Sequence, residues 1–421
     1  MPWVTETLAS QSMRFRTFHL SGFPFDGTLL GQFTECPAPV LRDLLIWPTR
    51  GVEEHPLGDR IKLPLIFAGY LPRLRRLSLA NVDTWPANNF NDLRAVHLKN
   101  AAQGLTYAEY FDFLAASPCL EELTMESSGP SGEYVVPPDL QIALPRLEKI
   151  RMVEVPSVCV ARLLTHLKPA DTLSIRIFSP PVDGLRPASV LATMSRLEAL
   201  RQVTKLALST AFSRGQHRRR LNINGAGLSR VELIGAGADP HEMASNQYMA
   251  AAVAFITACD VKELAIMTND DVIVREELWQ RLLFVMPSVT KLTLGPSFGR
   301  QSINDSPPPS PLGGSGLLSA LFSGDESVGR ALPCPSLKEL VLLGHISLSS
   351  QYAPSDSVSA EIRLFLEERK SRGFPLERVI FVELDSQWTQ QARAISAQYA
   401  NGLRDFVRDV QVVVRQALPE M

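Results

Sequence analysis

Apolar residues recur along this chain at relative positions 0, 3 and 5, and this spacing is its clearest pattern. Five copies fit it well: Leu74, Leu77 and Leu79; Leu120, Leu123 and Met125; Leu147, Ile150 and Met152; Val289, Leu292 and Leu294; and Leu337, Leu340 and Leu342. The last two members of each triplet are two positions apart, so they share one face of an extended strand. The pattern therefore predicts a series of short strands, each with one apolar face.

Weaker copies of the same triplet bring the series to thirteen candidate strands, spaced irregularly by 19 to 48 residues. These copies begin at Phe15, Leu41, Leu93, Ala170, Val203, Leu228, Val261 and Leu376. A single weak copy means little in a chain that is 45% hydrophobic, because such matches arise by chance. The prediction depends on the series as a whole.

Between the candidate strands lie segments in which apolar residues recur with the 3.6-residue period of a helix. They are 28–37, 107–118, 156–169, 188–203, 245–260, 275–287 and 357–373. Several end in a proline, such as Pro118, Pro169 or Pro287, which stops a helix and favours an extended chain. Helix and strand are thus expected to alternate.

A short strand cannot bury its apolar face alone, but parallel strands stacked side by side can bury a continuous core. The expected fold is α/β, a right-handed leucine-rich-repeat solenoid or horseshoe with a parallel sheet on the concave side and helices on the convex side. A doubly wound sheet fits less well, because no glycine-rich phosphate turn follows an early strand.

Two segments interrupt this series and a third one ends it. The Pro-, Ser- and Gly-rich stretch 297–335 separates two clear strands and is expected to leave the solenoid as a loop, and 130–145 to do so on a smaller scale. The solenoid itself is expected to cover 1–386. Residues 387–421 are expected to form a helical cap, with an apolar stripe through Phe406, Val410, Val413 and Val414 within 389–418.

Composition narrows the class of protein further. A formal net charge of −2 argues against a general binder of polyanions. There is neither an apolar run long enough to span a membrane nor the positive start and apolar run of a secretion signal, so an intracellular location, cytoplasmic or nuclear, is expected. The five cysteines are far apart, without a C-x-x-C motif, and are interpreted as small packing residues.

Sequence motifs for catalysis are almost lacking. The segment HEMAS at 241–245 lacks the second histidine of a zinc protease, and GGSGL at 313–317 lacks the final glycine of a nucleophile elbow. No phosphate-binding P-loop motif is present, and the seven histidines are scattered. The sequence thus predicts no enzyme activity, no cofactor and no metal site.

The remaining candidates for function are the outward-facing positions of the strands. In the middle units these carry five cations, Lys149, Arg151, Arg176, Lys205 and Arg230, with Glu122 and Glu126 beside them. These units are consecutive in the series, so the cations are expected to form a basic stripe on the concave face that selects a protein partner with an acidic segment. The alternative is that these charges only keep the sheet soluble and discourage edge pairing.

The basic segment RGQHRRR at 214–220 allows two similar interpretations. It is either a nucleic-acid or nuclear-import patch or a solvated loop after a strand. The absence of interleaved aromatic residues argues against nucleic acid.

Several segments resemble the leucine-rich-repeat region of F-box-like proteins from mushroom-forming fungi. They are LPRLRRLSLANV, LAASPCLEELTME, LPRLEKIRM, LLTHLKPADTLSIRIF, PCPSLKELVLLG and FLEERKSRGFPLERVIF, within about 39–385. In that family an F-box of about 45 residues precedes the repeats and docks onto a cullin-type ubiquitin ligase, while the repeats hold the protein to be ubiquitylated. No helical segment like that of an F-box precedes Phe15 here.

This resemblance implies a non-catalytic, protein-binding repeat domain that recognises substrates for an F-box-type ubiquitin ligase adaptor. The alternative is a free-standing leucine-rich-repeat scaffold with no ubiquitin role. Co-purification with a cullin adaptor distinguishes these two functions.

Overall fold

The computed structural model divides the chain into two compact units, Met1–Asp183 (unit 1) and Gly184–Met421 (unit 2). The residues that the structure describes are 7–24, 28–49, 62–85, 88–137, 139–178, 187–213, 218–227, 230–236, 253–268, 276–296, 332–343, 356–384 and 401–415. Most of the predicted loop 297–335 and half of the predicted helix 245–260 lie outside these residues, and the described part of that helix is helical at 253–257.

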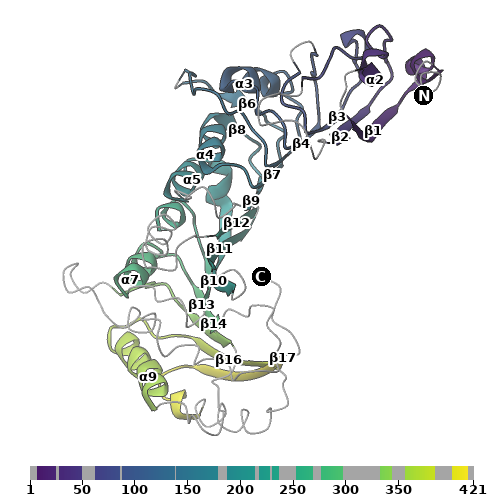
Figure 1. Cartoon of the computed structure of the whole chain (residues 1–421). Coiled ribbons are helices and arrows are strands. Elements are labelled where there is room, and N and C mark those ends of the chain that lie inside the picture. The colour runs from purple at the N-terminus through teal and green to yellow at the C-terminus, as the bar shows by residue number, and fades with distance from the viewer. Residues whose placement is uncertain are drawn as a thin grey trace. The chain divides into compact units, whose positions relative to one another are not determined.

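Unit 1 contains a sheet of seven strands, each parallel to its neighbours (Figure 1). In spatial order they are β1 (Thr17–Pro24), β2 (Asp43–Thr49), β3 (Arg76–Ala80), β4 (Ala95–Lys99), β5 (Glu122–Glu126), β7 (Lys149–Val153) and β9 (Ser174–Phe178). A second small sheet pairs β6 (Ile142–Ala143) with β8 (Leu167–Lys168). Spatial order follows chain order in the large sheet, as expected when each strand is added beside the previous one.

The helices of unit 1 connect these strands. They are α2 (Thr28–Gly31), α3 (Tyr107–Ala115) and α4 (Ser157–His166), with short 3-10 turns at η1 (Ser12–Arg14) and η2 (Phe67–Gly69). The α3 helix starts at a capping box in which Thr106 and Glu109 satisfy each other's free backbone N–H groups. From α3 the Tyr110 hydroxyl reaches Sδ of Met125 on β5 at 3.4 Å, so the helix packs on the face of the sheet that carries the apolar triplets.

The triplets form the core, as their spacing predicts. Every member of the five clear triplets is at most 4% exposed, and the second and third members lie on strands. Along β3, for example, Leu77 and Leu79 are buried while Arg76 is exposed and Ser78 half-buried. We call the face with the buried triplets the inner face and the opposite face the outer face. The alternation of strands and helices over a parallel sheet makes unit 1 an α/β structure.

Unit 2 has eight strands, in the spatial order β12 (Arg230–Ala236), β11 (Arg218–Gly227), β10 (Val203–Ser213), β13 (Glu263–Thr268), β14 (Lys291–Pro296), β15 (Glu339–Leu343), β16 (Arg378–Leu384) and β17 (Asp409–Arg415). From β10 through β13 to β17 all neighbours are parallel. Helices α5 (Pro187–Met194), α7 (Glu276–Phe284) and α9 (Asp356–Ser371) lie along one side of these strands, and a 3-10 turn η3 (Glu198–Gln202) precedes β10 (Figure 1).

The interpretation of 203–233 as two consecutive parallel units is wrong. Strand β11 pairs antiparallel with both β10 and β12 and separates them, so the two predicted strands are not neighbours. The basic residues Arg218, Arg219 and Arg220, which sequence analysis assigned to a loop or a nucleic-acid patch, begin this extra strand. At the end of β11, a Cβ on Gly227 would lie 2.4 Å from the Gln202 carbonyl oxygen. Only glycine therefore permits the backbone of β11 to come this close to the segment before β10.

The predicted C-terminal helical cap is also wrong for residues 409–415. They form β17, which continues the parallel sheet next to β16. Val410 and Val412 are in register with the inner-face residues Val379 and Phe381, so this segment has the two-residue period of a strand. The other predicted helices are confirmed at 107–115, 157–166, 187–194, 276–284 and 356–371.

A buried arginine joins helix α9 to the segment before β15. Arg369 is 1% exposed and donates hydrogen bonds to five backbone carbonyl oxygens, those of Pro333, Cys334, Pro335, Leu337 and Phe374, at 3.1–3.3 Å. Burial lowers the pKa of Arg369 to about 10, so the guanidinium stays charged at neutral pH. The five backbone carbonyl oxygens thus stabilise the buried charge of Arg369, a role that a carboxylate usually has.

Candidate binding surface

The outer face of unit 1 carries five of the seven residues that the sequence singled out. Glu122 and Glu126 lie on β5, Lys149 and Arg151 on β7, and Arg176 on β9. They alternate with buried inner-face residues, so their side chains leave the sheet on the same side. The predicted outward orientation of these positions is therefore confirmed.

Most of the charged side chains on this face form an ion pair with an oppositely charged side chain on a neighbouring strand. Lys149 Nζ lies 2.5 Å from Glu122 Oε1, and the hydrogen bond to Glu122 raises the pKa of Lys149. Glu126 lies 3.6 Å from Lys99 Nζ. Such exposed pairs stabilise a fold little, but they fix the register of neighbouring strands. Neither pair leaves surplus charge for a ligand.

Two arginines, Arg151 and Arg176, lie next to each other on this face. They occupy the same register position on neighbouring strands β7 and β9, and both are exposed. Within the described part of the chain, no carboxylate lies within 4 Å of Arg151. Two guanidinium groups at adjacent positions create a local positive potential on the outer face.

Lys205 and Arg230 belong to unit 2 and do not extend a stripe there. Their strands, β10 and β12, have β11 between them, so the predicted continuous series of cations on consecutive strands is wrong. Lys205 is also paired with Glu263, at 2.9 Å. Nothing is described of the Arg230 side chain beyond its place on β12.

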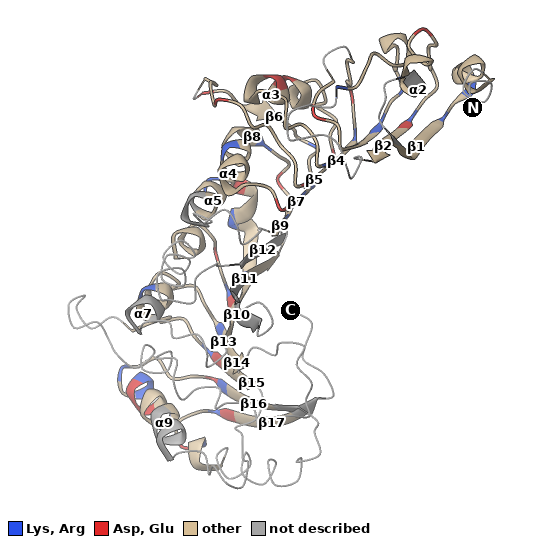
Figure 2. Ribbon diagram, in the orientation of Figure 1, with Lys and Arg blue, Asp and Glu red and all other residues tan. Residues whose placement is uncertain are grey.

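The outer face of unit 2 begins with a row of charges of alternating sign. Across β10 and β13–β17 the register runs Lys205, Glu263, Lys291, Glu339, Arg378 and Asp409 (Figure 2). Beside this row is a polar cavity of about 700 Å³, lined in addition by Thr290, Lys338, Glu377 and Arg408. Ion pairs such as Lys291–Glu339 and Lys338–Glu377, both 2.9 Å, occupy its charges, so the cavity offers no marked preference for an anion or a cation.

The next rows of that face are apolar and buried. Ala207, Ala265, Met267, Val341, Leu343 and Val382 are 3–8% exposed and form one cluster. Gly295 lies within it, and a Cβ there would come within 2.9 Å of Leu343 Cβ and 3.0 Å of Met267 Sδ. Since these side chains have little access to solvent, the polar outer face of unit 1 is the better candidate surface.

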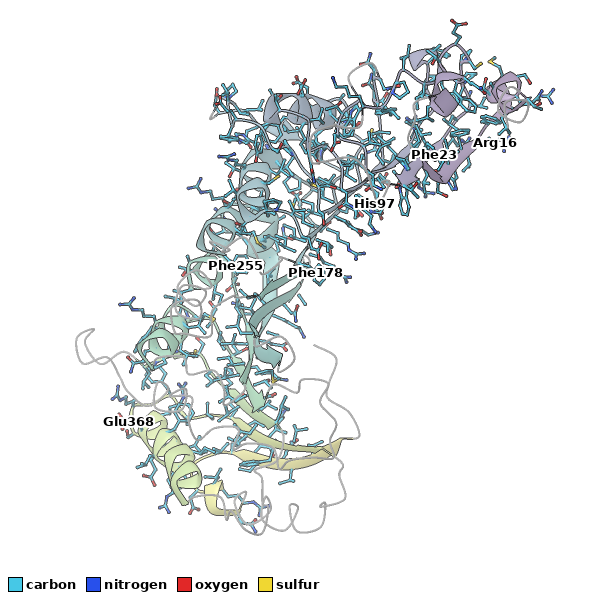
Figure 3. The ribbon with its side chains drawn as sticks, viewed as in Figure 1. Arg16, Phe23, His97, Phe178, Phe255 and Glu368 are labelled. Carbon is cyan, nitrogen blue, oxygen red and sulfur yellow. The ribbon has the colours of Figure 1, made fainter. Side chains whose placement is uncertain are left out.

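The unit 1 outer face also carries a hydrogen-bonded group that the sequence does not reveal. Trp47 Nε1 on β2 donates to Ser78 Oγ on β3 at 3.1 Å, and Ser78 Oγ lies 3.4 Å from His97 Nδ1 on β4. The Trp47 and His97 rings also meet edge to face, with centroids 5.8 Å apart. His97 lies on the side of the strands away from α3 and α4 (Figure 3). These residues come from three different strands and meet only through the parallel register, so no local sequence motif indicates the group.

His97 has an unusual electrostatic environment. Its Nε2 atom is buried without a hydrogen-bond partner among the described residues and lies 3.7 Å from Glu126 Oε1. Burial lowers the pKa of His97 below 6.5, with Lys99 and Arg151 acting in the same direction and Glu126 opposing them. His97 is therefore neutral at pH 7.

Acidification is expected to destabilise unit 1 through His97. Because the pKa is lower in the folded state, the unfolded chain binds more protons just below pH 6.5, and stability falls as the pH drops through that range. The free energy of unfolding in urea, measured at about pH 7.5 and 5.5, should fall more for the native chain than for His97→Gln. An identical fall in both would contradict the assignment.

A second group missed by sequence analysis lies in the segment 130–145, which it assigned to a loop. The Tyr134 hydroxyl hydrogen-bonds to Nε2 of buried His166, whose Nδ1 donates to the Leu140 carbonyl oxygen at 2.8 Å. Arg162 lies over the rings of Tyr107 and Tyr134, 5.0 and 4.5 Å from their centroids. Every polar group here has a partner, so the cluster anchors the segment to α3 and α4 rather than offering a reactive site.

The described residues meet the needs neither of a metal site nor of a reactive thiol. None of their histidine, cysteine and acidic side chains form a group that could hold a metal ion. All five cysteines are free, and burial raises the pKa of Cys159, Cys259 and Cys334 to about 12, so these thiols are protonated at neutral pH. Within the described part of the chain, no helix is both long and apolar enough to cross a membrane.

Comparison of the chain with protein-family models and with curated proteins finds no match.

Proposed function

We propose that this chain is a non-catalytic leucine-rich-repeat solenoid that binds another protein on the outer face of its strands. Its place would be substrate recognition in an F-box-type ubiquitin ligase adaptor, which requires an intracellular location. The repeated triplets and their burial on parallel strands support the repeat architecture. The resemblance of the six quoted segments to F-box-like proteins supports the ligase role.

The observation that carries the binding role is the arrangement of the unit 1 outer face. Successive parallel strands present exposed or half-buried side chains there in fixed register, without a covering helix (Figure 1). The surface is rigid, so little conformational entropy is lost when a partner docks. Two cations, Arg151 and Arg176, lie next to each other on it, which favours a partner with an acidic segment.

Reversing these two charges is expected to weaken partner capture. Tagged wild-type chain and the Arg151→Glu plus Arg176→Glu variant would be used to capture proteins from the native cells, with quantification by mass spectrometry. Reversing two positive charges at an interface lowers the association rate and adds repulsion, so we expect capture of the specific partner to fall at least about tenfold. The melting temperature should stay within about 2 °C, since both side chains are exposed.

The matched control is Arg73→Glu plus Arg146→Glu, which makes the same charge change at exposed turn positions of unit 1. Equal capture by the test and control variants would refute the outer face of unit 1 as the binding surface. Recovery of a cullin adaptor with the wild-type chain would support the ligase role. Capture of a partner without the adaptor would instead favour the free-standing scaffold.

A further inference from the structure

Strand β1 ends the sheet of unit 1 and leaves a row of backbone groups unpaired. Among the described residues its only neighbouring strand is β2, which runs parallel to it. The amide of Asp43 donates to the carbonyl oxygen of Arg16, so every second residue from Arg16 onward turns its backbone groups toward β2. The N–H and C=O groups of Thr17, His19 and Ser21 therefore point away from the sheet. An edge of this kind is a template for another strand.

This edge is not protected in the described part of the chain. The stretch 17–21 contains no lysine, acidic residue or proline, the residues with which proteins usually blunt an edge strand. The segment before β1 is held elsewhere, because Ser12 Oγ donates to the Pro37 carbonyl oxygen, in the connection before β2, at 3.0 Å. The regular edge ends before Gly22 and Pro24, where the register with β2 shifts.

The inner face of unit 1 is also incompletely covered beside β1. Leu20 is half-buried, whereas Ile46, its neighbour in register on β2, is 0% exposed. Leu8 and Met13, in the segment that leads into β1 at the same end of unit 1, are 42% and 54% exposed (Figure 1). Apolar surface therefore continues past the last strand, and a further strand with apolar inner positions would bury it.

The pattern of β1 fits a second copy of the same strand. In an antiparallel pair centred on His19, Thr17 faces Ser21 of the other copy at both ends, and the two His19 residues face each other. Each residue with unpaired backbone groups then exchanges two hydrogen bonds with its opposite residue. On the inner face, Phe18 of each copy lies opposite Leu20 of the other, so apolar side chains meet. One register thus satisfies both the backbone and the apolar positions.

We propose that unit 1 forms a two-fold symmetric dimer with a second copy of this chain, through antiparallel pairing of β1 over residues 17–21. The interface is isologous, since each copy contributes the same residues. The two-fold axis is perpendicular to the sheet, so the outer faces of the two unit 1 copies point to the same side and can engage one bivalent partner. This inference goes beyond the proposed function and does not depend on it.

Sedimentation velocity of the full chain between about 1 and 200 µM tests the dimer. Pairing of five residues buries less surface than a standard interface of about 1,600 Å², so we expect a reversible dimer with a dissociation constant in the micromolar range. The average mass should rise with concentration from that of one chain toward that of two. Hydrogen exchange at the amides of Thr17, His19 and Ser21 should slow over the same concentration range.

Two double variants at the same exposed positions test the register. Thr17→Lys plus Ser21→Lys places lysines opposite each other at both ends of the strand pair, and should raise the dissociation constant at least about tenfold. Thr17→Lys plus Ser21→Glu is the matched control. In the antiparallel register it places each lysine opposite a glutamate, so it should dimerise at least as tightly as the wild type. A circular-dichroism melt of each variant checks that the chain remains folded.

Two results would overturn this inference. One is a chain that stays monomeric over the whole concentration range. The other is an equal dissociation constant for the two double variants, which would place any dimer contact away from β1 or in another register. Neither result bears on the proposed function, which is decided by partner capture on the outer face.

Discussion

Replacing Arg369 with methionine is expected to destabilise unit 2 by about 1–3 kcal/mol, the cost of leaving buried hydrogen-bond acceptors without a donor. Methionine fills similar space but donates no hydrogen bond, so the five carbonyl oxygens that Arg369 contacts lose their donor. Four of these belong to the segment just before β15. We therefore expect that segment and the adjoining end of α9 to separate.

Urea unfolding followed by circular dichroism measures this change. The control is Arg363→Met on the same helix, an exposed arginine paired with Glu367 at 2.9 Å, whose loss should cost less than about 1 kcal/mol. Arg369→Lys should lie between the two, because an ammonium keeps the charge but has only three donors. If Arg369→Met costs no more than Arg363→Met, the carbonyl cage does not stabilise the fold.

The sequence could reveal the inner face because burial acts on single strands. A residue pair two positions apart shares a face whatever the neighbouring strand does, so Leu77 and Leu79 or Leu340 and Leu342 are recognisable without the fold. The same argument located the outer-face charges. The two-residue spacing on one strand does not determine whether that strand runs parallel or antiparallel to its neighbour. This is why the antiparallel course of β11 was missed.

In the C-terminal segment 409–415, the spacing of the apolar residues fits both a helix and a strand. In DVQVVVR, Val410, Val413 and Val414 fit a helical stripe, whereas Val410 and Val412 fit a strand, and the run is too short to distinguish the two. The exposed edge of β16 decides the outcome, since pairing with it satisfies the backbone of Asp409–Arg415. Such a gain depends on tertiary structure and leaves no local signal.

At the candidate site, too, features of a single strand could be predicted from the sequence, whereas contacts between strands could be predicted only in part. The triplet spacing predicted that Arg151 and Arg176 lie side by side, and the strand pairing confirms it; the continuation of the stripe to Lys205 and Arg230 was wrong, because β11 lies between their strands. Trp47, Ser78 and His97 come from three different units and carry no motif. The sequence does not single out Arg369, because its acceptors are backbone carbonyls, which no residue type marks.

Leu123→Ala is expected to cost about 2–5 kcal/mol, the range for truncating a fully buried leucine, and to loosen the strands on both sides of β5. Leu123 is 0% exposed and lies in register between Val96 on β4 and Ile150 on β7, so the cavity would open between three layers of the stack. Stability of a stacked array depends on contacts between neighbours, so the loss should be largest next to the mutation.

Hydrogen exchange is the most direct measurement of this local effect, combined with urea unfolding for the total. Amides of β4, β5 and β7 should lose more protection than those of β1 and β2. The matched control is Thr124→Ala, one position further on the same strand but on the outer face, which should change stability by less than about 1 kcal/mol. Leu292→Ala provides the same test on β14 of unit 2, where Leu292 is also 0% exposed. If Leu123→Ala and Thr124→Ala proved equally mild, the triplet leucines would not be the residues that hold these strands together.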